Sequence, residues 1–94
     1  MGEKVRAHAI IEGKVQGVFF RMETQKAADR FGVSGWVRNK SDGTVEAVFE
    51  GDKDSVESVL DWCRQGGPPA ARVDDMKIDW QNYEGQFSGF SVRY

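Results

Sequence analysis

The order of hydrophobic and polar residues switches repeatedly between the two-residue period of a β-strand and the longer period of an α-helix. Residues 4–12 alternate, so that one face of this segment is apolar and the other, which includes Ile10, is mixed. Residues 33–39 and 44–50 alternate in the same way, and Asp42-Gly43 between them is typical of a hairpin turn. We therefore predict a first strand and, further along the chain, a β-hairpin.

Two segments show the helical period instead. The first covers residues 21–31, and Gly32 follows it at a position where helices commonly end in glycine. The second begins after Asp52, a suitable N-cap, and is stopped by the glycines and prolines of residues 66–69. The apolar stripes of the two predicted helices consist of Thr24, Ala27, Ala28 and Phe31, and of Val56, Val59, Leu60 and Cys63.

Two further strands are predicted near the end of the sequence. Residues 73–80 carry Met76, Ile78 and Trp80 on one side, and residues 90–94 follow a polar loop. The resulting order, β-α-β-β-α-β with a late extra strand, is that of the ferredoxin-like split β-α-β fold in the α+β class. Both helices would cover one face of the sheet, and right-handed crossovers would place the first strand between the third and fourth. We expect residues 1–94 to form a single domain.

The amino-acid composition argues against several classes of function. The 13 basic and 15 acidic residues are interspersed and give a net charge of −2, which argues against nucleic acid or an acidic membrane as the main partner. A local cationic site for a small anion remains compatible with this balance. No apolar run approaches the length of a membrane span, and a single cysteine excludes an internal disulfide and a cysteine metal cluster. We expect a cytoplasmic monomer.

The segment from Gly13 to Arg21 (GKVQGVFFR) joins the first strand to the first helix. Its glycines permit a tight turn that exposes consecutive N–H groups beside the positive end of the helix dipole. Arg21 adds a planar guanidinium suited to phosphate, so the segment favours a phosphate or a carboxylate. A connection that needs glycine only for steric reasons explains the pattern equally well. The spacing matches neither the Walker A loop nor the dinucleotide-binding fingerprint.

Asn39 is a second candidate, because it ends a strand whose terminus can lie near this segment. Its amide both donates and accepts hydrogen bonds, so it could hold a water beside a bound phosphoryl group. On geometry alone, a simple role in starting the hairpin turn is favoured. His8 is expected at the surface on the sheet face away from the helices, and Cys63 is expected to be a small buried apolar residue. Neither is a candidate catalyst.

A binding module for single-stranded RNA shares the predicted topology. Trp36 with Arg6 and Arg38 could form an aromatic and basic surface for it. The RNA-recognition pattern of a basic residue, glycine and closely spaced aromatics is absent from residues 44–49. Glu46 and Glu50 on the outer face would also repel phosphates. RNA binding therefore ranks below an enzyme.

Two segments together, Gly13–Arg21 and Gly35–Asn39 (GWVRN), closely resemble the two signature segments of the acylphosphatase family. Their order and separation match, as do residues 42–46 and the final Tyr94, so the resemblance covers nearly the whole chain. It implies a hydrolase of carboxyl-phosphate anhydrides, free of metal and cofactor, with inorganic phosphate as product and inhibitor. A domain that handles carbamoyl phosphate for a larger maturation enzyme is a variant. A non-catalytic module that binds RNA or a small anion is the alternative.

The resemblance also implies roles for individual residues. The phosphoryl oxygens would be held by the Arg21 guanidinium and by the loop, while Asn39 would orient the attacking water. The implied phosphate-binding loop consists of the backbone N–H groups of Val15, Gln16, Gly17, Val18, Phe19 and Phe20. Simple chemistry agrees, since a carboxylic acid has a pKa of about 4 and its carboxylate departs without a general acid. The site then needs only charge stabilisation and water positioning.

Overall fold

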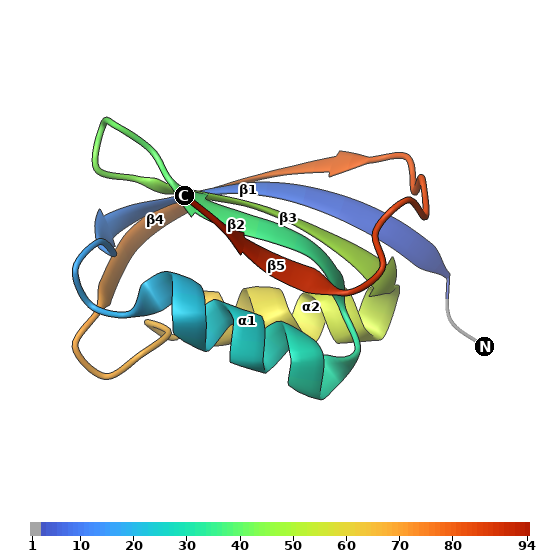
Figure 1. The fold of residues 1–94 in the computed structure, drawn as a ribbon, viewed down its shortest axis with the longest axis horizontal. Coiled ribbons are helices and arrows are strands. Elements are labelled where there is room, and N and C mark those ends of the chain that lie inside the picture. The colour runs from blue at the N-terminus through green and yellow to red at the C-terminus, as the bar shows by residue number, and fades with distance from the viewer. Residues whose placement is uncertain (1–2) are drawn as a thin grey trace.

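The computed structural model describes residues 3–94. A five-stranded sheet forms one layer and two helices form the other, so the predicted α+β ferredoxin-like fold is confirmed (Figure 1). The elements are β1 (Lys4–Lys14), α1 (Phe20–Phe31), β2 (Ser34–Asn39), β3 (Val45–Asp52), α2 (Lys53–Arg64), β4 (Arg72–Gln81) and β5 (Phe90–Arg93). Among residues 3–94, no helix is long and apolar enough to cross a membrane.

The strand order is β4-β1-β3-β2-β5, which confirms that β1 lies between β3 and β4. β1 is antiparallel to both of its neighbours, β3 and β4. β5 forms one edge of the sheet and pairs parallel to β2. The predicted hairpin between β2 and β3 is also confirmed. The Lys40 N–H donates to the Thr44 carbonyl (2.8 Å), and the Asp42 carboxylate accepts hydrogen bonds from the Thr44 N–H and hydroxyl.

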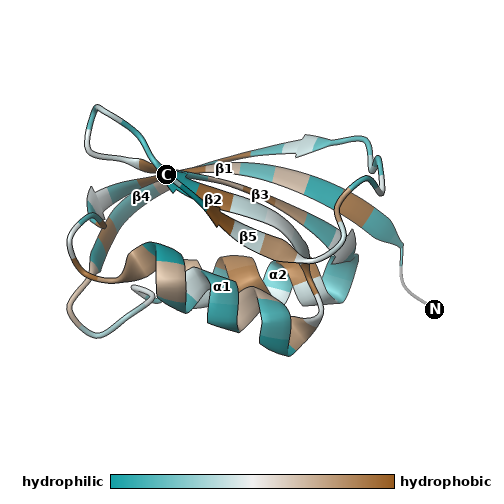
Figure 2. Ribbon diagram, in the orientation of Figure 1, coloured by the Kyte–Doolittle hydropathy of each residue, from teal (hydrophilic) through white to brown (hydrophobic). Residues whose placement is uncertain are grey.

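The core lies between the sheet and the helices, whose apolar faces turn toward the sheet (Figure 2). Seven of the eight predicted stripe residues are buried, but the prediction for Phe31 was wrong, because its side chain is 36% exposed. Phe31 is the last residue of α1, and its ring lies against the Arg30 guanidinium instead of the core. Phe20, at the opposite end of α1, is buried and its ring contacts Trp62 (5.9 Å between ring centroids).

Several strands are longer than predicted, because their ladders continue past the turn residues. β1 extends to Lys14 through a register shift at Gly13, and β4 begins correspondingly early. Gly13 permits this pairing because a Cβ there would lie 2.2 Å from the Arg72 carbonyl oxygen. Trp80 lies on the same side of β4 as Met76 and Ile78, as predicted, but it is 49% exposed, whereas Met76 and Ile78 pack against the core.

Two expectations for α2 had different outcomes. Asp52 occupies the N-cap position, but its side chain caps nothing and pairs with Lys4 Nζ (2.8 Å) instead. Cys63 is fully buried as predicted, and this burial raises the pKa of its thiol to about 12. The thiol therefore stays protonated at neutral pH and is a poor nucleophile.

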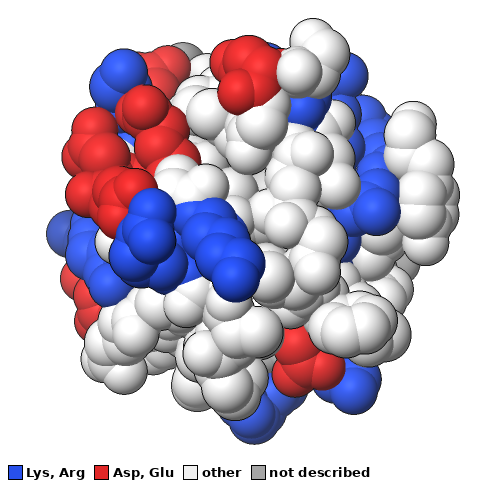
Figure 3. All heavy atoms as spheres, turned by 90° about the vertical axis from the view of Figure 1, so that its left-hand side faces the viewer, with Lys and Arg blue, Asp and Glu red and all other residues white. Residues whose placement is uncertain are grey.

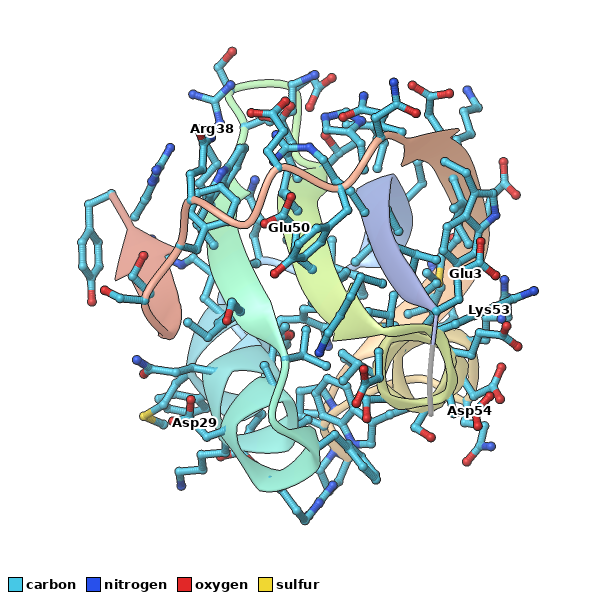
Figure 4. The ribbon with its side chains drawn as sticks, turned by 90° about the vertical axis from the view of Figure 1, so that its right-hand side faces the viewer. Glu3, Asp29, Arg38, Glu50, Lys53 and Asp54 are labelled. Atoms are coloured by element: carbon cyan, nitrogen blue, oxygen red, sulfur yellow. The ribbon has the colours of Figure 1, made fainter. Side chains whose placement is uncertain are left out.

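A buried carboxylate fixes the connection between β4 and β5. Glu50, on the sheet face away from the helices, is 1% exposed beneath residues 82–89 (Figure 4). It accepts hydrogen bonds from Arg6 Nη1 (3.2 Å) and from the N–H groups of Glu84 (2.9 Å) and Gly85 (3.2 Å). The sequence placed Glu50 on this face as a charge that would repel phosphates. It instead holds in place the segment that leads to β5.

Replacement of Glu50 should therefore destabilise the fold strongly. Glu50→Ala removes the carboxylate that pairs with Arg6 and leaves two backbone donors without their acceptor, and breaking a buried pair in this way costs about 3–5 kcal/mol. The measurement is the free energy of unfolding in urea. Asp61→Ala, which breaks an exposed pair with Arg64, is the control and should cost less than about 1 kcal/mol. Equal effects of the two substitutions would contradict the anchoring role of Glu50.

Candidate active site

The loop between β1 and α1 has an unusual backbone. Gly17 has φ 76°, and Phe19 has φ 63° and ψ 24°, so both residues are left-handed. Gly17 is required for this conformation rather than for space, since a Cβ there would meet nothing within 4 Å. Phe19 is a bulky residue in a region that costs about 1–3 kcal/mol, and such strain concentrates at functional sites. The backbone is therefore held in a shape that the residues would not adopt alone.

The N–H groups of this loop are available to a ligand. Among residues 3–94, none of the N–H groups of residues 16–20 donates a hydrogen bond within the protein. The same stretch runs into the first turn of α1, where the helix dipole is positive. Several free donors beside a positive helix end form a suitable site for an anion with several oxygens.

Side chains of the loop residues fasten it to the rest of the fold. Val15, Val18 and Phe20 are 1%, 6% and 1% exposed, so their side chains belong to the core. Gly67 allows close packing on Phe20, because a Cβ there would lie 2.7 Å from the ring. These contacts give the loop a preorganised shape before any ligand binds.

Gln16 adds a connection that the sequence did not reveal. Its Nε2 donates to the carbonyl oxygens of Lys40 (2.7 Å) and Thr44 (2.9 Å), which ties the loop to the β2–β3 hairpin. The sequence predicted only a backbone role for this residue. The two segments are 24 and 28 positions apart in the sequence, so only the tertiary structure brings the amide and these carbonyls together.

Arg21 lies in the first turn of α1 and is oriented by the C-terminal strand. Its Nη1 donates to the Arg93 carbonyl oxygen (3.2 Å), and its Cζ lies 4.7 Å from the centre of the Tyr94 ring. Within the described part of the chain, it forms no ion pair with a carboxylate. The guanidinium therefore has a fixed direction and an uncompensated charge.

Asn39 lies close to the loop because of the strand register. It pairs with Val45, and Val45 pairs with Ile11 near the end of β1. Its Oδ1 is buried and accepts no hydrogen bond from residues 3–94. Buried polar atoms nearly always have a partner, so this atom indicates a position for a water or a ligand. The signal was not visible in the sequence, where the turn-starting role was favoured.

One pocket of about 520 Å³ brings most of the predicted residues together. Its lining includes Val15, Gly17, Phe19, Phe20, Arg21 and Asn39. Gln16 and Val18 do not line it, since their side chains turn toward the hairpin and the core. The loop, the guanidinium and the amide thus face a common space that is large enough for a phosphoryl group and part of its substituent.

The sheet face away from the helices carries the other residues that the sequence singled out. His8 is half-buried there, as expected, and its Nε2 lies 2.7 Å from Glu46, a neighbour that the sequence did not predict. Partial burial acts to raise the pKa of Glu46, but hydrogen bonds from His8 and Arg38 lower it below its usual value. No group of three or more metal-ligating side chains occurs within residues 3–94.

The aromatic and basic surface proposed for RNA is occupied by contacts within the protein. The guanidinium groups of Arg38 and Arg93 lie 5.8 Å and 4.5 Å from the centre of the Trp36 ring. Arg38 also pairs with Glu46 (2.6 Å), and Arg6 pairs with Glu50. The cations of this surface are therefore neutralised by acidic partners or packed on the ring that a base would need.

Comparisons with known proteins identify the family of this chain. The family model for acylphosphatase matches residues 7–92. An acylphosphatase of Pelotomaculum thermopropionicum is 54% identical over 91 residues, covering 97% of this chain and 98% of the relative. One from an Anaeromyxobacter species is 50% identical over 94 residues, with complete coverage of both chains.

Solved structures extend this likeness. The Bacillus subtilis acylphosphatase has a TM-score of 0.91 and 32% identity, covering 96% of this chain and 99% of that one. The Coxiella burnetii enzyme has a TM-score of 0.89 and 39% identity, with coverage of 96% and 93%. The matches define a hydrolase that acts on acyl phosphates. The chain belongs to the acylphosphatase family.

Proposed function

We propose that the phosphoryl group of an acyl phosphate binds to the N–H groups of residues 15–20 and to the Arg21 guanidinium, while Asn39 orients the attacking water. The observation that carries this proposal is the buried Asn39 Oδ1 without a partner, in the same pocket as Arg21 and the loop. An acceptor at that position can take a hydrogen bond from a water and direct the lone pair of the water toward phosphorus.

The reaction needs little further chemistry. The water oxygen bonds to phosphorus, the bond between phosphorus and the acyl oxygen breaks, and the carboxylate leaves with the electron pair. Both protons of the water end on the phosphate. Since the carboxylate is a stable leaving group, the residues have to stabilise only the charge on the phosphoryl oxygens and the position of the water. Inorganic phosphate fits the same donors and should act as a competitive inhibitor.

All residues of the proposed site come from one chain, which supports an active monomer that folds as a single domain over residues 1–94. The acidic partners of Arg6 and Arg38 support the absence of nucleic acid among its partners. The cytoplasmic location stays a prediction from the sequence.

A solved structure of HypF from T. kodakarensis matches 96% of this chain over 12% of its own, with 27% identity and a TM-score of 0.83.

The direct test is the hydrolysis of benzoyl phosphate by the purified protein, without added metal and with EDTA. We expect EDTA to leave the rate unchanged, because the site relies on backbone and side-chain donors alone. Carbamoyl phosphate serves as a parallel substrate, and a strong preference for it would favour the variant that serves a larger maturation enzyme. RNA binding that falls with salt, without any hydrolysis, would favour the binding module.

A further inference from the structure

The last strand, β5, is short and lies at an edge of the sheet. It consists of four residues, Phe90–Arg93, and pairs with β2 along one side. The side chain of Phe90 is 6% exposed, and its ring stacks on Phe49 with 5.5 Å between the ring centroids. Tyr94, which follows the other end of the strand, is fully exposed. The core therefore anchors the start of β5 more firmly than its end.

Two side chains of α1 bind the backbone of β5. Arg21 Nη1 donates to the Arg93 carbonyl oxygen (3.2 Å), and Gln25 Nε2 donates to the Phe90 carbonyl oxygen (3.1 Å). The two donors are about one helical turn apart, and their acceptors are the last and first residues of β5, which runs alongside α1 (Figure 1). Helix, strand and the two hydrogen bonds thus form a closed frame, in which β5 cannot pivot on α1 without breaking one of these bonds.

We propose that Gln25 is a positioning residue for the hydrolysis. Its bond to Phe90 fixes β5 against α1, and β5 in turn fixes the two groups that orient the Arg21 guanidinium. These groups are the Arg93 carbonyl and the ring of Tyr94, whose centre lies 4.7 Å from Arg21 Cζ. Gln25 borders the same pocket as Arg21, but its Nε2 is bonded to the strand, so we assign it an action through β5 and Arg21. This inference rests on the proposed phosphate site.

The direction of the guanidinium matters because no other cation can replace it. Arg21 lines the pocket of about 520 Å³, and neither a lysine nor a second arginine does so within residues 3–94. Figure 3, which views the end of the molecule that carries the loop, shows a broad uncharged area between groups of charged residues. A misplacement of about 1 Å in a catalytic geometry can lower the rate about 100-fold, so a loose β5 should be visible in kcat.

The first test is Gln25→Met, which keeps the size of the side chain and a good helix former but removes the donor. It should lower kcat for benzoyl phosphate about tenfold and change KM less than about threefold, because the loop N–H groups still bind the phosphoryl group. Gln65→Met is the matched control. It makes the same exchange at an exposed position at the end of α2 and should leave both constants unchanged.

Combining Gln25→Met with Arg21→Ala separates an action through Arg21 from other roles. Residues that act through one another are not additive, so Gln25→Met should lower kcat less than about twofold when Arg21 is already absent. A residue that touches the substrate directly, or one that only stabilises the fold, would give the same loss with and without Arg21. Equal losses in the two backgrounds would overturn the positioning role.

Nitrogen NMR of the Arg21 guanidinium gives a measurement that does not depend on activity. A guanidinium held by a carbonyl and an aromatic ring rotates slowly about its Nε–Cζ bond. Gln25→Met should speed this rotation about threefold, because it weakens the hold of β5 on the group, and Gln65→Met should not. Unchanged rotation in Gln25→Met would overturn the frame while the phosphate site stands. If the rotation responds but wild-type protein hydrolyses no acyl phosphate, the frame stands and the proposed function fails.

Discussion

Arg21→Ala should lower the turnover of acyl phosphates by about 10²–10³-fold and weaken the binding of inorganic phosphate. The guanidinium is the cation that faces the loop from the first turn of α1, and it has no carboxylate partner within residues 3–94. Removing a single fixed donor from such a site costs roughly 3–4 kcal/mol of transition-state stabilisation, which corresponds to about 10²–10³-fold in rate. The measurements are kcat for benzoyl phosphate and the dissociation constant of phosphate by calorimetry.

Arg30→Ala is the matched control, since it removes the same charge from the last turn of the same helix. It should leave both quantities within about twofold. Arg21→Lys keeps the charge but loses the planar fork, so its activity should fall between the wild type and Arg21→Ala. Phosphate binding by Arg21→Ala at the wild-type level would contradict a role for this residue in holding the phosphoryl group.

Asn39→Ala should lower kcat about 100-fold and change phosphate affinity by less than about threefold, if the amide positions water rather than phosphate. The two quantities separate because the water and the phosphoryl oxygens use different groups of the site. The thermal stability of Asn39→Ala is a further measurement that tests the role of this residue. Oδ1 accepts no hydrogen bond from residues 3–94, so its removal leaves no partner unsatisfied and the melting temperature should stay equal or rise.

Asn39→Asp is a useful companion because it keeps the size of the side chain and adds a negative charge. It should weaken phosphate binding by repulsion, which Asn39→Ala should not do. A large loss of phosphate affinity in Asn39→Ala would make Asn39 a phosphate-binding residue. A clear loss of stability would instead support the simple role of ending β2 and starting the hairpin.

Much of the fold followed from local patterns. The Asp42-Gly43 turn and the helical stripe of α2 predicted their elements, and the rule for right-handed crossovers predicted the central place of β1. The failures occurred where the ends of elements meet solvent or other segments. Phe31 has the helical spacing of a core residue, but periodicity does not tell where the covering sheet ends. Asp52 is a residue type that commonly caps helices, but its carboxylate pairs with Lys4 from a distant segment instead of capping α2.

The candidate site was predictable only in part for the same reason. Glycines, the arginine and the strand-ending asparagine are visible as residue types. The features that give them meaning are tertiary: the left-handed Phe19, the bonds of Gln16 to the hairpin, and the buried atom of Asn39. Glu50 shows most clearly what local patterns cannot predict. The alternation of residues placed its side chain correctly on the outer face of the sheet, but it could not show that a later loop covers this side chain.

The contact between Arg21 and residues 93–94 joins segments that are 72 positions apart in the sequence. Contacts of such separation require long-range closure of the chain, and a short edge strand such as β5 is among the first elements to open in local unfolding. Detachment of β5 would release the guanidinium while the other four strands and the helices stay paired. Enzymatic activity therefore reports the docking of β5, whereas the circular dichroism of the helices reports the core, and the two signals need not disappear together as denaturant is added.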